Sequence, residues 1–256
     1  MSCMDVLATY ARIMTDMFQA IASTQREPLE KAAGIIASAV AENRRVHVLG
    51  TGAHSMMAAE EVLWRAGGLA AWNPIIDPGT SLIHGAKRSV SFERMPGYGI
   101  AVLNAYEVGK TAGEVMVLVN AYGIDPMSLD VALECQKRGV CVIAITSRAY
   151  GESVPRDSAL RHPSGKNLFE VADVFLDCGV PLGDAVIPVE GMEQKVGSAS
   201  TICNCFLINA LQAAVAQRLI ARGLEAPVFM SANLPGGDEA NQRWETKYAP
   251  IARYMK

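Results

Sequence analysis

Residues suited to anion binding gather where the first apolar run of this chain ends. The run Val46–Leu49 is short and stops at the turn Gly50-Thr51-Gly52-Ala53-His54-Ser55, after which a helical pattern follows at once. A strand, a glycine turn and a helix start direct backbone N–H groups at one place, where an anion binds readily. The sequence therefore predicts a substrate-binding loop that uses Thr51, Gly52, His54 and Ser55.

Two further loops are expected beside it. The stretches 114–119 and 140–145 are apolar in every residue except Glu114, as buried parallel strands are. Ligands of such sheets lie at the carboxyl ends of the strands. The residues that follow the two strands are Asn120 and Tyr122 after the first, and Thr146 and Ser147 after the second. We expect all four to contribute to one composite site.

Carboxylates near these loops are candidate bases. Glu60 and Glu61 are adjacent, so on a helix their side chains point about 100° apart. Glu61 is spaced i,i+4 from Arg65 and suits an ion pair, which leaves Glu60 for chemistry. Glu193 is the rival base, and Lys195 beside it is a candidate partner for an anionic oxygen. The sequence leaves the choice between the two glutamates open.

Histidine can complete an acid–base pair, and His162 stands in a polar loop. His84 ends an apolar stretch and is a second candidate, whereas His47 lies inside a predicted strand and is expected to be structural. The cysteines and histidines show no metal-ligand spacing such as CxxC or HExxH, so no metal is expected. The six cysteines lie mostly in apolar runs and are expected to be reduced.

The remaining elements follow from periodicity and capping signals. Two amphipathic helices precede the first strand. Asp125, Pro126 and Gly139 mark the start and end of a helix between two strands. A further strand is predicted at 174–176, a helix that is apolar nearly all round at 196–222, and a polar C-terminal helix docked through Trp244, Tyr248 and Ile251.

Composition excludes several classes of protein. The formal net charge is −3 and half of the 256 residues are hydrophobic, so no basic nucleic-acid surface is expected. No apolar run has the length of a membrane span, and the N-terminus has no secretory pattern, so we expect a cytoplasmic protein. The apolar helices offer more surface than one sheet can cover, which predicts a homodimer or homotetramer.

The motifs together resemble those of the sugar isomerase (SIS) domain family. The resemblance rests on the turn at 50–55, Tyr122-Gly123, Ala144-Ile145-Thr146-Ser147 and the segment His162-Pro163-Ser164-Gly165. Later segments of the same resemblance are Pro181–Ala185, Glu193–Gly197 and Gly236–Glu239. It covers nearly the whole chain.

The resemblance implies an α/β three-layer sandwich with a five-stranded parallel sheet, N-terminal helices and a C-terminal helix. One domain would span 1–256, with a helical pair at 1–45, a core at 46–223 and an extension at 224–256. The family usually needs no cofactor, and related isomerases carry a base on the helix that holds Glu60. A histidine like His162 lies in the active site of arabinose-5-phosphate isomerases, and look-alikes also carry one at His84.

The function implied is an aldose–ketose isomerase acting on a phosphorylated or sulfonated sugar through an enediol. The alternatives are a lyase or etherase of the same fold, and a non-catalytic sugar-phosphate sensor. Phosphate-binding members usually show Ser-x-Ser-Gly in the second loop, where this chain has Asn120-Ala121-Tyr122-Gly123. The difference slightly favours a sulfonate or another atypical anion over phosphate.

Overall fold

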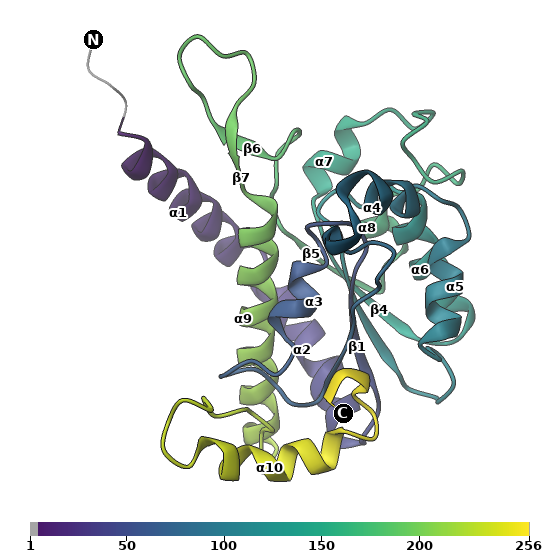
Figure 1. The fold of residues 1–256 in the computed structure, drawn as a ribbon, viewed down its shortest axis with the longest axis vertical. Coiled ribbons are helices and arrows are strands. Elements are labelled where there is room, and N and C mark those ends of the chain that lie inside the picture. Colours follow the sequence, from purple (N-terminus) through teal and green to yellow (C-terminus); the bar gives the residue numbers. More distant parts are fainter. Residues whose placement is uncertain (1–4, 256) are drawn as a thin grey trace.

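A parallel five-stranded sheet forms the centre of the molecule (Figure 1). The computed structural model describes residues 5–255. The strand order is β2-β1-β3-β4-β5, with all neighbours parallel. The strands are β1 Val46–Gly50, β2 Trp72–Ile75, β3 Val115–Val119, β4 Cys141–Thr146 and β5 Val174–Asp177. The predicted α/β sandwich with a five-stranded parallel sheet is confirmed.

Helices cover both faces of the sheet (Figure 1). One face packs against α1 Val6–Thr24, α2 Arg26–Ala41, α3 Met57–Glu61 and α9 Ser200–Ala221. The other carries α5 Tyr98–Ala105, α6 Pro126–Lys137 and α8 Leu168–Val171, with α4 Ala86–Glu93 beside α6. The remaining helices are η1 Leu82–His84, α7 Arg148–Ser153, α10 Gly237–Tyr248 and η2 Arg253–Met255.

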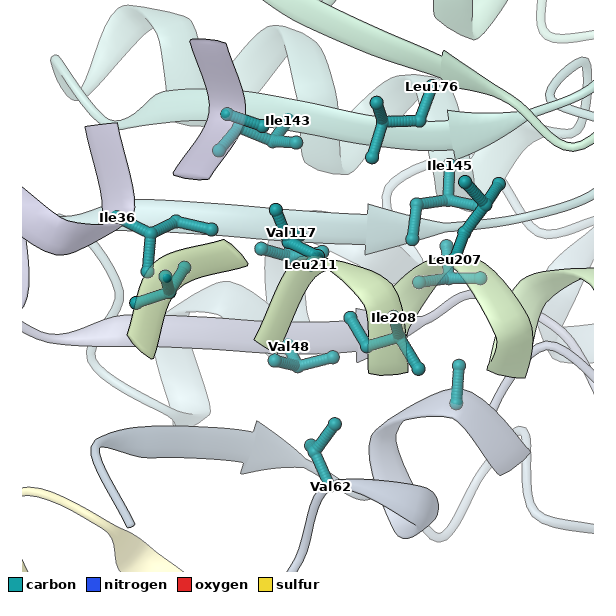
Figure 2. Close-up of a cluster of buried hydrophobic side chains, with 14 of the residues drawn as sticks. Ile36, Val48, Val62, Val117, Ile143, Ile145, Leu176, Leu207, Ile208 and Leu211 are labelled. Carbon is teal, nitrogen blue, oxygen red and sulfur yellow. The ribbon is translucent and has the colours of Figure 1, made fainter. Parts of the chain in front are cut away.

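The larger hydrophobic core lies under α9 (Figure 2). Leu207, Ile208 and Leu211 of α9 are almost fully buried against side chains of the sheet such as Val117 and Ile145. Burying one such side chain contributes about 1.5–3 kcal/mol to folding. This core holds α2 and α9 in place, and α9 in turn begins beside the carboxyl ends of the strands.

Two expectations for the elements need correction. The helix predicted for 196–222 begins only at Ser200, because Val196–Ser198 forms strand β7 and pairs antiparallel with β6, Ala185–Ile187. This hairpin projects from the body of the molecule beside α1 (Figure 1). Strand β2 was not expected, because its short sequence contains Pro74; as an edge strand, it tolerates a residue without an N–H.

Several local predictions are confirmed. Asp125 caps α6 by accepting a hydrogen bond from Ser128 N–H at 2.9 Å. Glu61 pairs with Arg65 at 3.3 Å. In the C-terminal helix Trp244 and Tyr248 are buried, and Ile251 just beyond it is half-buried.

Five cysteines are free thiols, while Cys3 lies outside the described residues. Within residues 5–255 no helix combines the length and the apolar character that crossing a membrane requires.

Candidate functional site

A cavity of about 290 Å³ opens where β1, β3 and β4 end, at the edge of the sheet where the sequence predicts a site. Segments far apart in the chain line it, from the turn after β1 to the start of α9. The lining residues are Gly52, Ala53, His54, Ser55, Leu82, Ala86, Val90, Glu93, Arg94, Asn120, Ala121, Tyr122, Ile124, Asp125, Tyr150, Leu160, Asp184 and Ser200. Gly52, His54, Ser55, Asn120 and Tyr122 are thus brought together as expected.

The turn 52–55 presents a row of backbone donors to this cavity. The N–H of Thr51 donates a hydrogen bond to Val119 O, and the N–H of Met56 donates one to Gly52 O. The four N–H groups between them find no acceptor within residues 5–255. Gly52 has φ +126°, a conformation that L side chains rarely adopt. Successive free N–H groups of this kind form a concave site for an oxyanion.

The helix after this turn is shorter than the sequence suggests. It comprises only Met57–Glu61, and the chain then turns through Trp64 with φ 47°. So short a helix carries little dipole, since the macrodipole grows with the number of aligned peptide units. The anion-binding capacity of this site therefore rests on the N–H groups of the turn itself.

Glu93, at the end of α4, places its carboxyl group directly over Gly52. A Cβ built on Gly52 would lie 3.1 Å from the carboxyl carbon and from both oxygens of Glu93. Burial, followed by the negative charge of Asp125, raises the pKa of Glu93 to about 8, against the opposing effects of Arg94 and a hydrogen bond from Asn120. At neutral pH Glu93 is therefore mostly a protonated acid that can donate a hydrogen bond.

A second carboxyl group, Asp125, lies on the floor of the cavity. Its two oxygens accept hydrogen bonds from the N–H and the hydroxyl of Ser128, at 2.9 and 2.7 Å. Burial raises the pKa of Asp125 to about 6, although the bonds from Ser128 oppose this rise. Ser128 also bonds to the hydroxyl of Thr51, so the predicted ligand Thr51 is buried beneath the floor and does not line the cavity.

Asn120 joins the first and second loops. Its side-chain oxygen accepts hydrogen bonds from the N–H groups of Tyr122 and Gly123, both at 2.9 Å. Its amide nitrogen donates to the carbonyl of Thr51. Asn120 is 1% exposed, so these bonds hold the two loops together at the wall of the cavity. The residue that replaces a phosphate-binding serine is thus committed mainly to the protein.

Two stacked tyrosines form another wall. The rings of Tyr122 and Tyr150 are 4.2 Å apart and nearly parallel, at 15°. Burial, followed by the charge of Asp184, raises the pKa of Tyr122 to about 12. Both phenols are consequently neutral donors at physiological pH. A flat aromatic wall with polar tips is suited to the C–H face and hydroxyl groups of a sugar.

Asp184 closes the far side of the cavity and caps α9. Its carboxyl group accepts hydrogen bonds from Ala199 N at 3.0 Å, and from Ser200 N and Oγ at 2.8 Å each. The cavity is therefore lined by three carboxyl groups, Glu93, Asp125 and Asp184, and by one guanidinium group, that of Arg94. This balance of charge is unusual for a site that must hold a phosphate dianion.

The other predicted binding residues lie outside the lining of the cavity. Thr146 is fully buried, and its hydroxyl finds no partner among the described residues. The hydroxyl of Ser147 donates to Val180 O at 2.6 Å and also caps α7. Lys195 is exposed in the loop of the β6–β7 hairpin.

The four predicted catalytic residues do not line the cavity either. His84 is exposed at the end of η1, Glu60 is exposed on α3, and Glu193 is exposed in the hairpin loop. His162 bonds to Ser164 Oγ at 2.8 Å and to Asp130 Oδ1 at 3.3 Å. Its backbone N–H bonds to the carbonyl of Ile124, so its segment borders the cavity without placing the imidazole in it.

Sequence reasoning missed Glu93, Arg94 and Tyr150 as lining residues. Glu93 ends a short helix of mixed polarity that carries no chemical motif, and Arg94 follows it directly. Tyr150 lies on α7, just after Thr146 and Ser147, which were expected at the site, but no pattern singled out its ring. Only Asp184, beside Gly183, had a usable signal as a turn residue near the cleft.

Comparison with known proteins agrees with this architecture. The model of the SIS domain family matches residues 9–147. A UPF0309 protein from Brucella anthropi is 38% identical over 222 residues, which cover 87% of each chain. A UPF0309 protein from Shouchella clausii is 33% identical over 253 residues, covering 98% of this chain and 100% of the relative.

Two solved structures are similar in fold. Phosphoheptose isomerase GmhA from Neisseria gonorrhoeae has a TM-score of 0.55 and 17% identity, over 82% of this chain and 97% of that chain. The NanR protein of Vibrio vulnificus, complexed with ManNAc-6P, has a TM-score of 0.52 and 13% identity, over 96% of this chain and 70% of that chain. By the family match and the extent of the relatives, this chain belongs to the SIS domain family.

Proposed function

We propose that this protein is an aldose–ketose isomerase that acts on a sugar carrying an anionic group. One observation carries the proposal: the protonated carboxyl group of Glu93 lies against Gly52, the first residue of the turn whose N–H groups, at 52–55, have no acceptor among residues 5–255. Such donors stabilise an oxygen that becomes negative when a proton leaves the neighbouring carbon. Membership of the SIS family, and a neighbour named as a phosphoheptose isomerase, support the same reaction class.

Two of the three carboxyl groups of the cavity, Asp125 and Glu93, divide the proton transfers in this proposal. Asp125, mostly ionised at neutral pH, removes the proton from C2 of an open-chain aldose while Glu93 protonates the oxygen on C1. The enediol then collapses: Asp125 returns its proton to C1, and the hydroxyl on C2 gives its proton to Glu93. Paired groups whose pKa values are pushed apart suit such a division between acid and base.

The anionic group of the sugar is assigned to Arg94 at the exposed side of the cavity. A permanent dianion seated directly against Glu93, with Asp125 nearby, would face strong repulsion in a poorly solvated place. Glu60, Glu193, His162 and His84 remain the competing proton carriers predicted from sequence. Glu193 and Lys195 do not line the cavity described above, so a role for them requires a different binding site.

Exchange in heavy water tests the proposal. The purified protein is incubated with phospho- and sulfo-sugars, and incorporation of deuterium at carbon is followed by NMR. We expect Asp125→Asn to reduce exchange by roughly 10²–10⁴, because the base is lost. Asparagine is as good an N-cap as aspartate, so α6 should stay folded. Glu42→Gln, at an exposed site remote from the cavity, is the matched control.

The pH profile separates the two roles. kcat/KM should fall below about pH 6, where Asp125 becomes protonated, and above about pH 8, where Glu93 loses its proton. Glu93→Gln should lower the rate and remove the alkaline limb only. Exchange that survives Asp125→Asn but is lost in Glu193→Gln or Glu60→Gln would move the base to the other residue.

A lyase or etherase is the second candidate, and the protonation of Glu93 is the observation that favours it. The same acid can protonate a departing oxygen after a proton is removed from carbon. Release of a β-substituent, seen as a new alcohol or acid in the NMR spectrum, would identify this reaction. Tight binding of sugar phosphates with no exchange at all would instead favour the sensor.

A further inference from the structure

We infer that a second site, remote from the cavity described above, binds a small polyanion between the C-terminal segment and the start of β1. A cavity of about 440 Å³ opens there. It lies at the amino ends of β1 and β2, the opposite end of the sheet from the candidate active site. Arg45, Asn73, Asn104, Glu107 and Arg253 supply its polar lining.

The acceptor groups of this lining are already engaged. Asn104 Oδ1 accepts from Arg138 Nη2 at 2.6 Å, and Asn73 Oδ1 accepts from the backbone N–H of Arg253 at 3.0 Å. Oε1 of Glu107 is paired with Lys110 Nζ at 2.5 Å, and Lys110, followed by the charges of Arg45 and Arg253, lowers the pKa of this carboxyl group. The polar lining therefore offers a ligand few free acceptors.

Donor groups, by contrast, are available. The half-buried Arg45 has no side-chain hydrogen bond or ion pair among residues 5–255. Arg253 uses Nη1 to reach the carbonyl of Ala105 at 2.8 Å and stacks 4.6 Å over the ring of Tyr106, which fixes its plane. Its remaining N–H groups, and the amide N–H₂ of Asn104, have no hydrogen-bond partner among the described residues.

A lining with several free donors and mostly occupied acceptors favours a ligand that accepts hydrogen bonds. Two guanidinium groups, one of them held flat by an aromatic ring, favour carboxylate or phosphate oxygens, which they can bind with two parallel bonds each. The volume suits a small molecule, so the ligand class is a polycarboxylate or a phosphorylated metabolite. This inference does not depend on the proposed isomerase activity.

Calorimetric titration with citrate and, separately, with inorganic pyrophosphate tests the site. We expect saturable binding of at least one of them to the wild type. Arg45→Gln should weaken that binding by about 10–100-fold, since a charge-assisted contact is lost. Because the Arg45 side chain makes no bond to the described protein, this variant should keep its fold and its thermal midpoint. Arg12→Gln, on the exposed surface of α1, is the matched control.

Two further measurements make the result decisive. Arg94→Gln, which removes the guanidinium of the catalytic cavity, should bind the same anion as the wild type does, and this assigns the binding to the second site. Arg253→Lys keeps the charge but loses the planar fork, and it should weaken binding by about tenfold. Equal affinity of Arg45→Gln and the wild type for the anion would overturn the inference. So would the absence of binding of either anion at concentrations up to about 20–50 mM, where even a weak complex is populated.

Discussion

The buried pair of His47 and Glu114 should make the protein sensitive to acid. Glu114 is 1% exposed and accepts four hydrogen bonds. The donors are His47 Nε2 at 3.0 Å, Gly109 N at 2.6 Å, and the N–H and hydroxyl of Thr111 at 3.0 and 2.5 Å. Burial by itself raises the pKa of Glu114, but the bonds from His47, Thr111 and Gly109 outweigh it and lower the pKa to about 2.

The shift has a calculable consequence for stability. A fall in pKa from 4.5 to about 2 corresponds to about 3 kcal/mol of stabilisation. Since the pKa is lower in the folded state, this contribution is complete above the unfolded value near 4.5 and is lost as the pH falls toward 2. By pH 3 only about 1 kcal/mol of it should remain.

Glu114→Gln tests this reasoning, because glutamine keeps the shape but cannot accept from all four donors. Urea unfolding at pH 7 should show a loss of about 3 kcal/mol at unchanged m value, and at pH 3 the gap to the wild type should shrink to about 1 kcal/mol. Glu42→Gln, an exposed glutamate, should show neither effect. A variant within 1 kcal/mol of the wild type at pH 7, with the same acid sensitivity, would refute the argument.

Three further predictions concern the site and the assembly. Gly52→Ala should lower the free energy of unfolding by about 1–2 kcal/mol in urea, because residue 52 has a positive φ. Its added Cβ should also displace the Glu93 carboxyl group and lower isomerase turnover, as kinetics would show. Prolonged dialysis against a strong chelator should leave turnover unchanged; recovery of lost activity by one divalent ion would contradict the metal-independent mechanism. Light scattering should give the mass of a dimer or a larger oligomer. Phe206 lies in an apolar groove on α9, where it stacks on Phe18, and Phe206→Glu should lower the measured mass toward the 27.4 kDa of one chain.

Most of the sheet was predictable because its strands carry continuous apolar runs and its helix α6 carries explicit end signals. Asp125, Pro126 and Gly139 bound that helix closely to its observed limits. Strand β2 escaped prediction because four residues with an internal proline carry no strand signal. The start of α9 was misplaced because Val196 continues the apolar pattern of the helix, while its pairing with Ile187 is a tertiary contact that no local pattern encodes.

The site was predictable only in part, for a similar reason. The loops that follow β1 and β3 were found, since the topology of a parallel sheet places them together. Glu93 was not, because its unusual acidity comes from burial against Gly52 and from the charge of Asp125, more than thirty positions further along. Thr51 shows the converse: a hydroxyl in an anion loop that the fold turns toward Ser128 instead.

The packing of the N-terminal helices against α9 bears on how the chain folds during its synthesis. Arg218 of α9 pairs with Glu30 of α2, and Ser198 accepts a hydrogen bond from Tyr10 of α1; each pair is separated by 188 positions. At a translation rate of about 5–20 residues per second, the first helices wait about 10–40 s for these partners. The part of their apolar surface that packs on α9 has no partner until then, although α2 can pack earlier on β1, β3 and β5. We therefore expect chaperones to shield the α9-facing surface of α1 and α2 during that interval.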